Sequence, residues 1–337
     1  MNTVNNSFSD EMSSPDQMKK CLEARMEQLA KEDICLAFSG GVDSSLLLKT
    51  AADAAAHTGR KVYAVTFDSR LHPSCDLEIA RRVAGELGGI HEVITVDELE
   101  QESIKNNPVN RCYLCKRHLF SRLAELAEAR GIRYILDGTN EDDMHVYRPG
   151  IRALKELGII SPLAELHITK AQVKALASEY GISVASRPST PCMATRLPYG
   201  AALDYEVLRR IGEGEAYVRT MVPGNVRLRL HGDIVRLELD PEAFEVFMKG
   251  RKEIVSRLKE MGFVYITLDA EGFRSGSMDT RLNGPEVQQK NRVPIKTEYT
   301  NEGQNIINNW SMFLLRVYKE YETIFVLSAS PVLSIYR

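Results

Sequence analysis

The sequence has no excess of basic residues and no long apolar run. Its 337 residues carry 43 Lys and Arg against 46 Asp and Glu, a formal net charge of −3. That balance argues against a dedicated nucleic-acid binder, which usually carries a basic excess. Charges interrupt the longest apolar stretches within about ten residues, too short for a helix to span a membrane. The composition is that of an ordinary soluble enzyme, with neither nucleic acid nor membrane as the expected partner.

The N-terminal segment also lacks the features of a secretory signal peptide. Residues 1–16 are polar and acidic, without the basic and apolar regions of such a peptide, and we expect them to be disordered. The cytoplasm is then the expected compartment. Because that compartment is reducing, the six cysteines are expected to be thiols or metal ligands before disulfides.

Short apolar runs alternate with amphipathic stretches between residues 17 and 187. Strands are predicted at residues 34–38, 61–68, 91–97 and 134–140. Helices are predicted at residues 15–31, 46–59, 75–89, 113–130 and 170–180. Because strands and helices alternate with short connections, we expect an α/β fold in which helices cover both faces of a parallel sheet.

The pattern changes near residue 187, where a proline-rich loop replaces the alternation of strand and helix. Residues 188–279 are predicted to form a smaller α+β domain with a tight turn at His231 and Gly232. The helices and strands expected there occupy residues 204–219, 226–239, 241–261 and 264–269. A chain of 337 residues exceeds the usual size of one core, which agrees with two domains.

Seven consecutive residues between a predicted strand and a predicted helix form the most informative motif. They are Ser39, Gly40, Gly41, Val42, Asp43, Ser44 and Ser45. The glycines let the backbone turn tightly and approach an anion, and the helix N-terminus adds amide donors. The serines add hydroxyl donors, and Asp43 is placed to hold Mg²⁺ against phosphate charge. The motif lacks the Lys of a Walker-type loop, and its plain alternative is an ordinary turn between strand and helix.

This motif resembles the PP-loop of the ATP pyrophosphatase family. The resemblance implies that the loop grips the pyrophosphate that leaves ATP when a substrate becomes adenylylated. It also implies that Thr66 and Phe67 lie near the adenine and ribose, and that Gly138 helps to close the nucleotide site. Both segments end predicted strands, where ligands of open α/β sheets bind.

Cys112 and Cys115 form a C-x2-C pair, which supplies two ligands but cannot complete a four-ligand zinc site. No second pair exists, and Cys192 in the proline-rich loop is the remaining candidate. Three cysteines suit an iron–sulfur cluster with one iron free of protein ligands. The alternative is that Cys112 and Cys115 are incidental thiols at a helix start. Cys35 lies in an apolar strand and is expected in the core.

Cys192 is also a candidate nucleophile. Arg187 and Arg196 lie near it in the sequence, so we expect its pKa to be lowered. A thiolate that faces an adenylylated electrophile is what sulfur transfer requires.

Taken together, residues 39–45, 111–116, 187–201 and 226–239 resemble the LarE family of ATP-dependent sulfur transferases, which act in nickel-pincer cofactor synthesis for lactate racemase. The resemblance spans about residues 17–279, and residues 280–337 are left without an assignment. It implies a pyridinium-3,5-dicarboxylate mononucleotide as substrate, one carboxylate of which is adenylylated and then attacked by a cysteine. Some members give up the sulfur of that cysteine, which matches Cys192. A second branch holds a 4Fe–4S cluster on three cysteines, which match Cys112, Cys115 and Cys192.

The resemblance assigns an anion-binding role to Arg227 and Arg229, because they match the two residues that bind the substrate phosphate in that family. Their spacing on a strand puts both guanidinium groups on one face. The alternative is a solvated basic face beside Glu238. The same resemblance places Thr195 and Arg196 along the substrate site.

Three further residues carry weaker expectations. Glu215 and Glu238 match acidic residues near the substrate, and Glu238 is a candidate metal ligand. Lys116 either neutralises phosphate charge or is a lysine on a helix surface.

Other functions remain open at this point. A tRNA thiolase also combines a PP-loop with three cysteines, but the acidic net charge speaks against it. An amidotransferase or NAD synthetase would leave the cysteines idle, and a nucleotide sensor without catalysis is the remaining alternative. The resemblance further implies a homo-oligomer and, as partners, the nickel-insertion and carboxylation enzymes of the same route.

Overall fold

The computed structural model describes residues 15–72, 74–146, 148–188 and 190–279. The described residues between Pro15 and Met278 belong to one compact unit. Pro15 and Asp16, predicted to be disordered, instead begin helix α2 (Pro15–Leu29). The expected disorder of residues 1–14 and the unassigned segment 280–337 lie outside the described residues. The boundary predicted near residue 187 stays a prediction.

Four parallel strands form the larger sheet and confirm the α/β class. They are β1 (Ile34–Ala37), β2 (Val62–Ser69), β3 (Ile90–Val96) and β4 (Tyr134–Leu136), in the order β3-β2-β1-β4. Strands β2 and β3 therefore follow β1 on one side, and β4 lies on the other side of β1. The strand order thus reverses between β1 and β4, and ligands of such sheets bind at this point, beyond the carboxyl ends of the strands.

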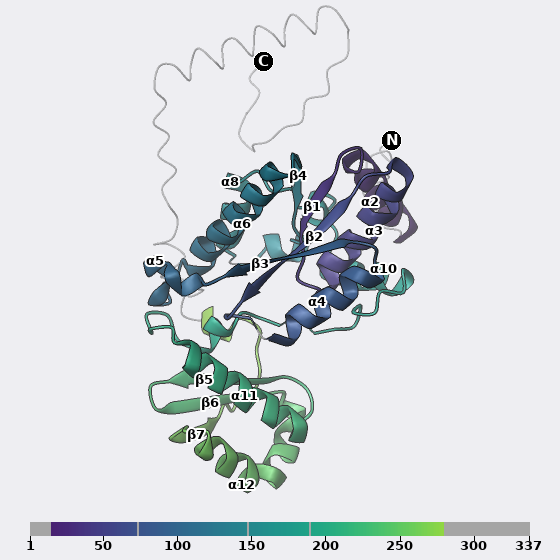
Figure 1. The fold of residues 1–337 in the computed structure, drawn as a ribbon. Coiled ribbons are helices and arrows are strands. Elements are labelled where there is room, and N and C mark those ends of the chain that lie inside the picture. The colour runs from purple at the N-terminus through teal and green to yellow at the C-terminus, as the bar shows by residue number, and fades with distance from the viewer. Residues whose placement is uncertain (1–14, 73, 147, 189, 280–337) are drawn as a thin grey trace, which may run out of the picture. The chain divides into compact units, whose positions relative to one another are not determined.

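Helices cover both faces of this sheet, as predicted (Figure 1). One face packs against α2, α3 (Val42–Thr58), α4 (Ser74–Glu86) and α10 (Lys170–Glu179). The other packs against α6 (Arg111–Ala129) and α8 (Gly150–Glu156). Alternation along β1 sends Leu36 to the first face and Cys35 to the second. Cys35 is fully buried and burial raises its pKa to about 12, which confirms its place in the core.

The second sheet has three strands in the order β5-β6-β7. Strands β5 (Val226–His231) and β6 (Ile234–Leu239) form the predicted hairpin, and β7 (Tyr265–Leu268) joins β6 in parallel. Its apolar residues pack against α11 (Tyr205–Met221) and α12 (Phe244–Glu260). The alternate residues of β5, which include Arg227 and Arg229, point to the opposite face.

Several short helices were not predicted from the sequence. They are α5 (Glu102–Lys105), α7 (Glu141–Met144), α9 (Pro162–Glu165), and the 3-10 turns η1 (Glu98–Glu100), η2 (Met193–Arg196) and η4 (Ser277–Asp279), whereas η3 (Pro241–Ala243) forms the start of the helix predicted at residues 241–261. Segments of three or four residues are too short to show helical periodicity. The strand predicted at residues 134–140 ends at Leu136, because the polar residues that follow leave the sheet for the nucleotide side.

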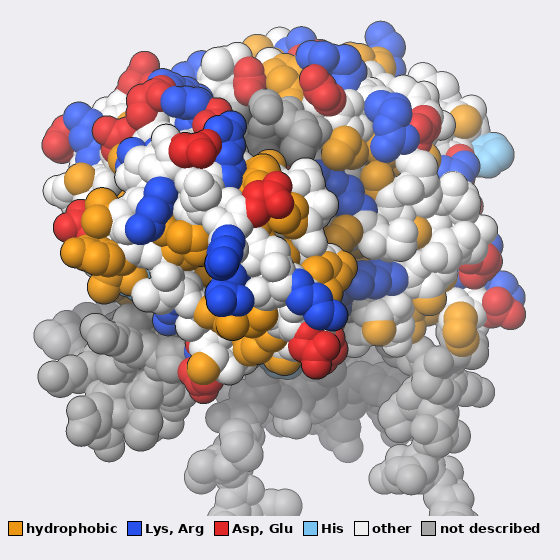
Figure 2. Space-filling view, turned by 90° about the horizontal axis from the view of Figure 1, so that it is seen from below, with side chains coloured by type: hydrophobic (Ala, Val, Ile, Leu, Met, Phe, Trp, Pro, Cys, Tyr) orange, Lys and Arg blue, Asp and Glu red, His pale blue; other side chains and the backbone are white. Residues whose placement is uncertain are grey.

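The surface in Figure 2 carries apolar side chains scattered among charged ones. Exposed apolar residues include Ile234, which pairs with Tyr265 across the second sheet. Tyr265 is also exposed, so the two side chains lie next to each other on this surface. No helix in the described part of the chain is both long and apolar enough to cross a membrane.

Candidate functional site

The PP-loop motif follows the carboxyl end of β1, at the point where the strand order reverses. Helix α3 begins at Val42, directly after Gly41, and its first intrahelical hydrogen bond runs from the Ser45 amide to the Gly41 carbonyl at 3.0 Å. The amides of Val42, Asp43 and Ser44 therefore precede the first bonded turn, where helix amides are available to an anion. The motif has the local geometry that phosphate binding requires.

Both the backbone conformation at position 40 and the close approach of neighbouring atoms require a glycine there. Its φ is +65°, and a Cβ atom would lie 2.8 Å from the Ala80 Cα on α4. The loop is closed by serine hydroxyls, since the Ser39 amide donates to the Ser44 Oγ at 3.3 Å and that hydroxyl donates to the Gly41 carbonyl at 3.2 Å. The Ser45 Oγ is buried without a partner in the described structure.

Asp43 has two partners from distant parts of the chain. The Asn140 amide donates to Oδ1 at 3.0 Å, and the Lys170 ammonium pairs with Oδ2. Lys170 opens helix α10, whose start is fixed by a capping box between Thr169 and Gln172. Sequence reasoning missed Lys170, which brings to this loop the positive charge that the motif itself lacks.

The end of β4 lies against the PP-loop, and the end of β2 contacts Phe38, which directly precedes the loop. A Cβ on Gly138 would lie 3.1 Å from the Ser44 amide nitrogen, so the end of β4 runs directly against the PP-loop. Thr66 is buried and donates to the Phe38 carbonyl at 2.7 Å, while Phe67 packs against Phe120 of α6. Whether Thr66 and Phe67 contact a nucleotide stays a prediction.

Lys116 reaches from α6 toward the end of β4. Its ammonium lies 3.8 Å from the Asp137 carboxylate, and the side chain is 35% exposed. Asp137 in turn accepts a hydrogen bond from the Thr139 hydroxyl at 2.6 Å. The lysine thus lies beside the carboxyl end of β4, on the same side of the sheet as the PP-loop, rather than on an isolated helix surface.

The two cysteines of the C-x2-C pair lie in the first turns of α6. Cys112 is exposed, and Cys115 is half-buried against the same apolar cluster as Cys192. The guanidinium of Arg111 donates to the Cys112 Sγ at 3.5 Å. Burial lowers the pKa of Arg111, but the charges of Cys192 and Cys112 outweigh it and raise that pKa.

The prediction that Arg187 and Arg196 lower the Cys192 pKa is wrong. Burial raises that pKa, and the guanidinium that opposes the shift is Arg111. Arg187 instead pairs with Asp76 and donates to the Gly40 carbonyl at 3.4 Å. Arg196 is committed to a buried carboxylate, so neither side chain is available to the thiol.

The expected iron–sulfur site is not supported by the described geometry. Burial, followed by the charge of Cys192, holds the Cys115 pKa well above its usual value, so this thiol favours its protonated form. Within the described residues, no group of three or more His, Cys, Asp or Glu side chains is placed to hold a metal ion.

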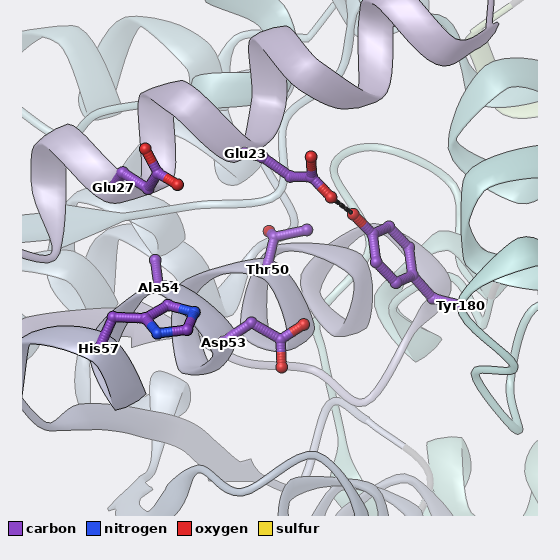
Figure 3. A pocket seen from close by; sticks show the side chains of 7 residues that line it. All are labelled: Glu23, Glu27, Thr50, Asp53, Ala54, His57 and Tyr180. Carbon is purple, nitrogen blue, oxygen red and sulfur yellow. Dashed lines mark hydrogen bonds between the residues drawn. The ribbon is translucent and has the colours of Figure 1, made fainter.

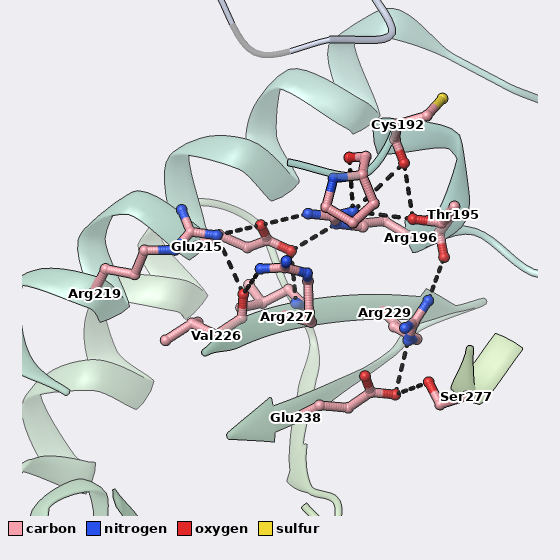
Figure 4. Close-up of polar contacts among 12 residues, drawn as sticks. Cys192, Thr195, Arg196, Glu215, Arg219, Val226, Arg227, Arg229, Glu238 and Ser277 are labelled. Carbon is pink, nitrogen blue, oxygen red and sulfur yellow. Dashed lines mark hydrogen bonds and ion pairs between the residues drawn. The ribbon is translucent and has the colours of Figure 1, made fainter. Parts of the chain in front are cut away.

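Arg196 and Glu215 anchor the loop that carries Cys192 (Figure 4). The Arg196 Nε and a terminal nitrogen donate to the two oxygens of Glu215 at 2.8 and 3.0 Å. The remaining nitrogen donates to the Thr195 hydroxyl at 3.0 Å and to the carbonyl of Pro191 at 3.2 Å. All three guanidinium nitrogens of Arg196 are therefore used to hold the loop in place, and none is free to bind a substrate.

Arg229 is also partly committed. It donates to Glu238 at 2.7 Å and to the Thr195 carbonyl at 2.6 Å. Glu238 accepts further hydrogen bonds from Arg236 and from Ser277, at 2.9 and 2.8 Å. The predicted metal ligand Glu238 thus lies among guanidinium groups, and its second oxygen has no partner in the described structure.

Arg227 is the arginine with spare binding capacity. It is 8% exposed, donates to the Val226 carbonyl at 2.8 Å and lies over the Phe273 ring at 5.3 Å. Among the residues described, it forms no direct ion pair with a carboxylate. Burial, followed by the charge of Arg196, lowers its pKa to about 10. A partly buried guanidinium with cationic neighbours favours an anionic ligand.

The Cys192 loop is bonded to both sheets. The Met193 amide donates at 2.8 Å to the carbonyl of Leu71, which follows β2, while the Thr195 carbonyl accepts from Arg229. The loop that carries Cys192 therefore joins the end of β2 to the arginine-bearing face of β5.

One cavity lies away from these residues (Figure 3). It measures about 130 Å³ and lies among helices α2, α3 and α10, with lining residues Glu23, Glu27, Thr50, Asp53, Ala54, His57 and Tyr180. The Tyr180 hydroxyl donates to Glu23 at 2.6 Å. None of the residues predicted for ATP, substrate or sulfur lines it.

The chain is similar to known proteins over most of its length. Residues 15–139 match the asparagine synthase family. The chain is 35% identical to the pyridinium-3,5-bisthiocarboxylic acid mononucleotide synthase of Lactiplantibacillus plantarum, across 80% of this chain and 96% of that protein. It is 38% identical to an uncharacterized protein of Synechocystis, across 77% of this chain and 99% of that protein. An argininosuccinate synthase of Maricaulis maris is 30% identical over 45% of this chain and 40% of its own length.

Proposed function

This chain belongs to the family of the pyridinium-3,5-bisthiocarboxylic acid mononucleotide synthase, and from that premise we propose that it is an ATP-dependent sulfur transferase acting on a pyridinium-3,5-dicarboxylate mononucleotide. The observation that carries the proposal is the Cys192 loop, which bonds to the nucleotide edge through Met193 and to the arginine face through Thr195. A sulfur nucleophile in that position can meet a substrate that is activated on one side and anchored on the other.

The first step activates a substrate carboxylate. A carboxylate oxygen attacks the α-phosphorus of ATP, the bond to the β-phosphate oxygen breaks, and pyrophosphate leaves. The amides that open α3 receive the pyrophosphate charge, with Lys170 and Lys116 as nearby cations. Asp43 would hold the Mg²⁺ that offsets this charge, since it lies in the first turn of α3, directly after the loop glycines.

Arg227 and Arg229 are proposed to hold the substrate phosphate. Both project from the same face of β5, and Arg227 retains donors that its Val226 contact does not use. Glu215, predicted as a substrate residue, serves instead as the anchor of Arg196.

The second step transfers sulfur. The Cys192 thiolate attacks the acyl carbon and AMP leaves, which gives a thioester; loss of the Cys192 α-proton and cleavage of its Cβ–S bond then leave a thiocarboxylate and dehydroalanine. Cys112, Cys115 and Cys192 are the residues that would hold a 4Fe–4S cluster, since the first two lie on α6 and Cys115 packs against the same apolar cluster as Cys192. Such a cluster, when bound, supplies sulfide as an alternative donor. The cytoplasmic location, the homo-oligomer and the partner enzymes stay predictions.

The test is an anaerobic reaction with ATP and the dicarboxylate mononucleotide, followed by mass spectrometry of product and protein. AMP, pyrophosphate and thiocarboxylate are expected together, whereas Cys192→Ser should still release pyrophosphate in the first step but form no thiocarboxylate. A protein that loses one hydrogen sulfide per product used Cys192 as the donor, whereas an unchanged mass indicates an external or cluster-bound donor. Release of AMP and pyrophosphate with no sulfur-containing product would contradict the proposal.

A further inference from the structure

Asn107 occupies a strained and fully buried position just before α6. Its φ is +46°, in the left-handed region that non-glycine residues rarely adopt, and its side chain is 0% exposed. Such a conformation persists only where surrounding contacts determine it, and it often marks a functional constraint. The contacts of Asn107 therefore show what this position is built to hold.

The side-chain amide of Asn107 donates to the segment that follows Cys192. Its acceptors are the carbonyls of Leu197 and Pro198 at 3.0 and 2.9 Å, and that of Ala194 at 3.4 Å. The Asn107 carbonyl also accepts the Gly200 amide at 3.1 Å. One asparagine thus binds four positions of the segment between residues 194 and 200.

The other end of the same side chain binds the cysteine helix. The Asn107 Oδ1 accepts a hydrogen bond from Arg111, which is 2% exposed, and Arg111 also donates to the Cys112 Sγ at 3.5 Å. The chain of contacts therefore runs from Cys112 through Arg111 and Asn107 to the backbone beyond Cys192. Residues 80 or more positions apart in the sequence are joined by it.

We infer that Asn107 and Arg111 are positioning residues that set the approach of Cys192 to Cys112 and Cys115. The inference rests on the proposed function, because it concerns the same sulfur site. The asparagine fixes the separation of the two segments, and the guanidinium joins the asparagine to the Cys112 thiol. Neither residue touches ATP or the transferred atoms, so their loss should affect sulfur transfer and leave nucleotide binding in place.

The test measures how fast Cys192 links to Cys112 or Cys115 with a short reagent that joins two thiols, with the linked peptides identified by mass spectrometry. Asn107→Ala removes the amide from three carbonyls, and the rate should fall about tenfold, the equivalent of one or two buried hydrogen bonds. Asn107→Gly should behave in the same way, since it accepts the positive φ and lacks only the amide. Arg111→Lys should also slow linkage, because one ammonium cannot bridge Asn107 and Cys112 with the geometry of a guanidinium.

Asn225→Ala is the matched control. Asn225 also bonds through its side-chain amide, to Asp240 at 3.1 Å, but outside the thiol site. It should leave linkage unchanged, and all four proteins should bind ATP as the wild type does. If Asn107→Gly links at the wild-type rate, or if Asn225→Ala is slowed equally, the inference is overturned. A wild-type protein that links its thiols but releases no pyrophosphate would instead sink the proposed function.

Discussion

Arg196 and Glu215 form a two-armed ion pair in which each side chain is only 2% exposed. Arg196 is also bonded to the carbonyls of Pro191 and Cys192, at 3.2 and 3.4 Å, so the pair fastens the thiol loop to α11. Glu215 further accepts the Leu228 amide at 3.0 Å and Arg219 at 2.7 Å. A single carboxylate therefore joins the Cys192 loop, α11 and β5.

Glu215→Gln should strongly destabilise the protein. Removal of one partner from a buried ion pair leaves an uncompensated charge, at a cost of about 3–5 kcal/mol. Urea unfolding measures this loss. Glu213→Gln, two positions away on the exposed side of α11 and paired with Arg209, is the control and should change stability by no more than about 0.5 kcal/mol. Similar losses in the two variants would show that the Glu215 pair does not fix this region.

The stability of the fold should also depend on pH through Glu215. Burial alone would raise its pKa, but hydrogen bonds and charge from Arg196, with the Leu228 amide, lower the net pKa below the ordinary value. The stabilisation is therefore present above the unfolded-state pKa of about 4.3 and is lost as pH falls through the folded-state pKa. Unfolding measured at several acidic pH values should show a shallower pH dependence in Glu215→Gln, by up to about 1.4 kcal/mol per pH unit. Equal slopes in variant and wild type would contradict this assignment.

Gly40→Ala should abolish ATP binding. The new Cβ would lie 2.8 Å from the backbone of Ala80, and φ at this position is +65°, so the PP-loop must move away from α4. Calorimetry with ATP measures the effect. Gly59→Ala is a close control, because Gly59 has φ +69° but nothing within 4 Å of its Cβ position. It should lower stability by about 1 kcal/mol and leave ATP binding intact. Retention of ATP binding by Gly40→Ala would count against the loop as the phosphate site.

Arg227→Gln should weaken binding of the mononucleotide substrate. Arg227 keeps N–H donors that its contact with Val226 does not use, whereas Arg196 is already paired with Glu215. Loss of a charge-assisted bond to phosphate should raise KM for this substrate by about tenfold to a hundredfold, with KM for ATP unchanged. Steady-state kinetics that vary each substrate in turn separate the two. An equal rise in both KM values would point to a structural role for Arg227.

The sequence predicted the parts of the site that are contiguous in the chain. The PP-loop was identifiable because strand, glycines and helix follow one another, and Arg227 and Arg229 because alternation puts them on one face. Lys170 was missed because it lies 127 positions from Asp43, and no local pattern links the two. The role of Arg196 was misjudged for the same reason: its closeness to Cys192 in sequence was visible, but its buried partner on α11 was not.

Lys170→Met should impair the ATP step more than ATP binding. Lys170 pairs with Asp43 at the PP-loop, and its side chain is 34% exposed, so the ammonium is free to turn toward a phosphate group in the loop. Charge on the pyrophosphate increases as its bond to the α-phosphorus breaks, and a preorganised cation stabilises that state more than bound ATP. Loss of one such group typically costs about a hundredfold in kcat.

The measurement is the rate of pyrophosphate release at saturating ATP and substrate. Lys174, on the same helix, is the control, and Lys174→Met should release pyrophosphate as the wild type does. Removal of Lys170 also removes a competitor for Asp43, so Lys170→Met should bind Mg²⁺ alone more tightly than the wild type. Slower turnover with tighter Mg²⁺ binding is a combination that general damage to the loop would not produce, because damage would weaken both. Weaker Mg²⁺ binding in the variant would mean that Lys170 merely holds the PP-loop in shape.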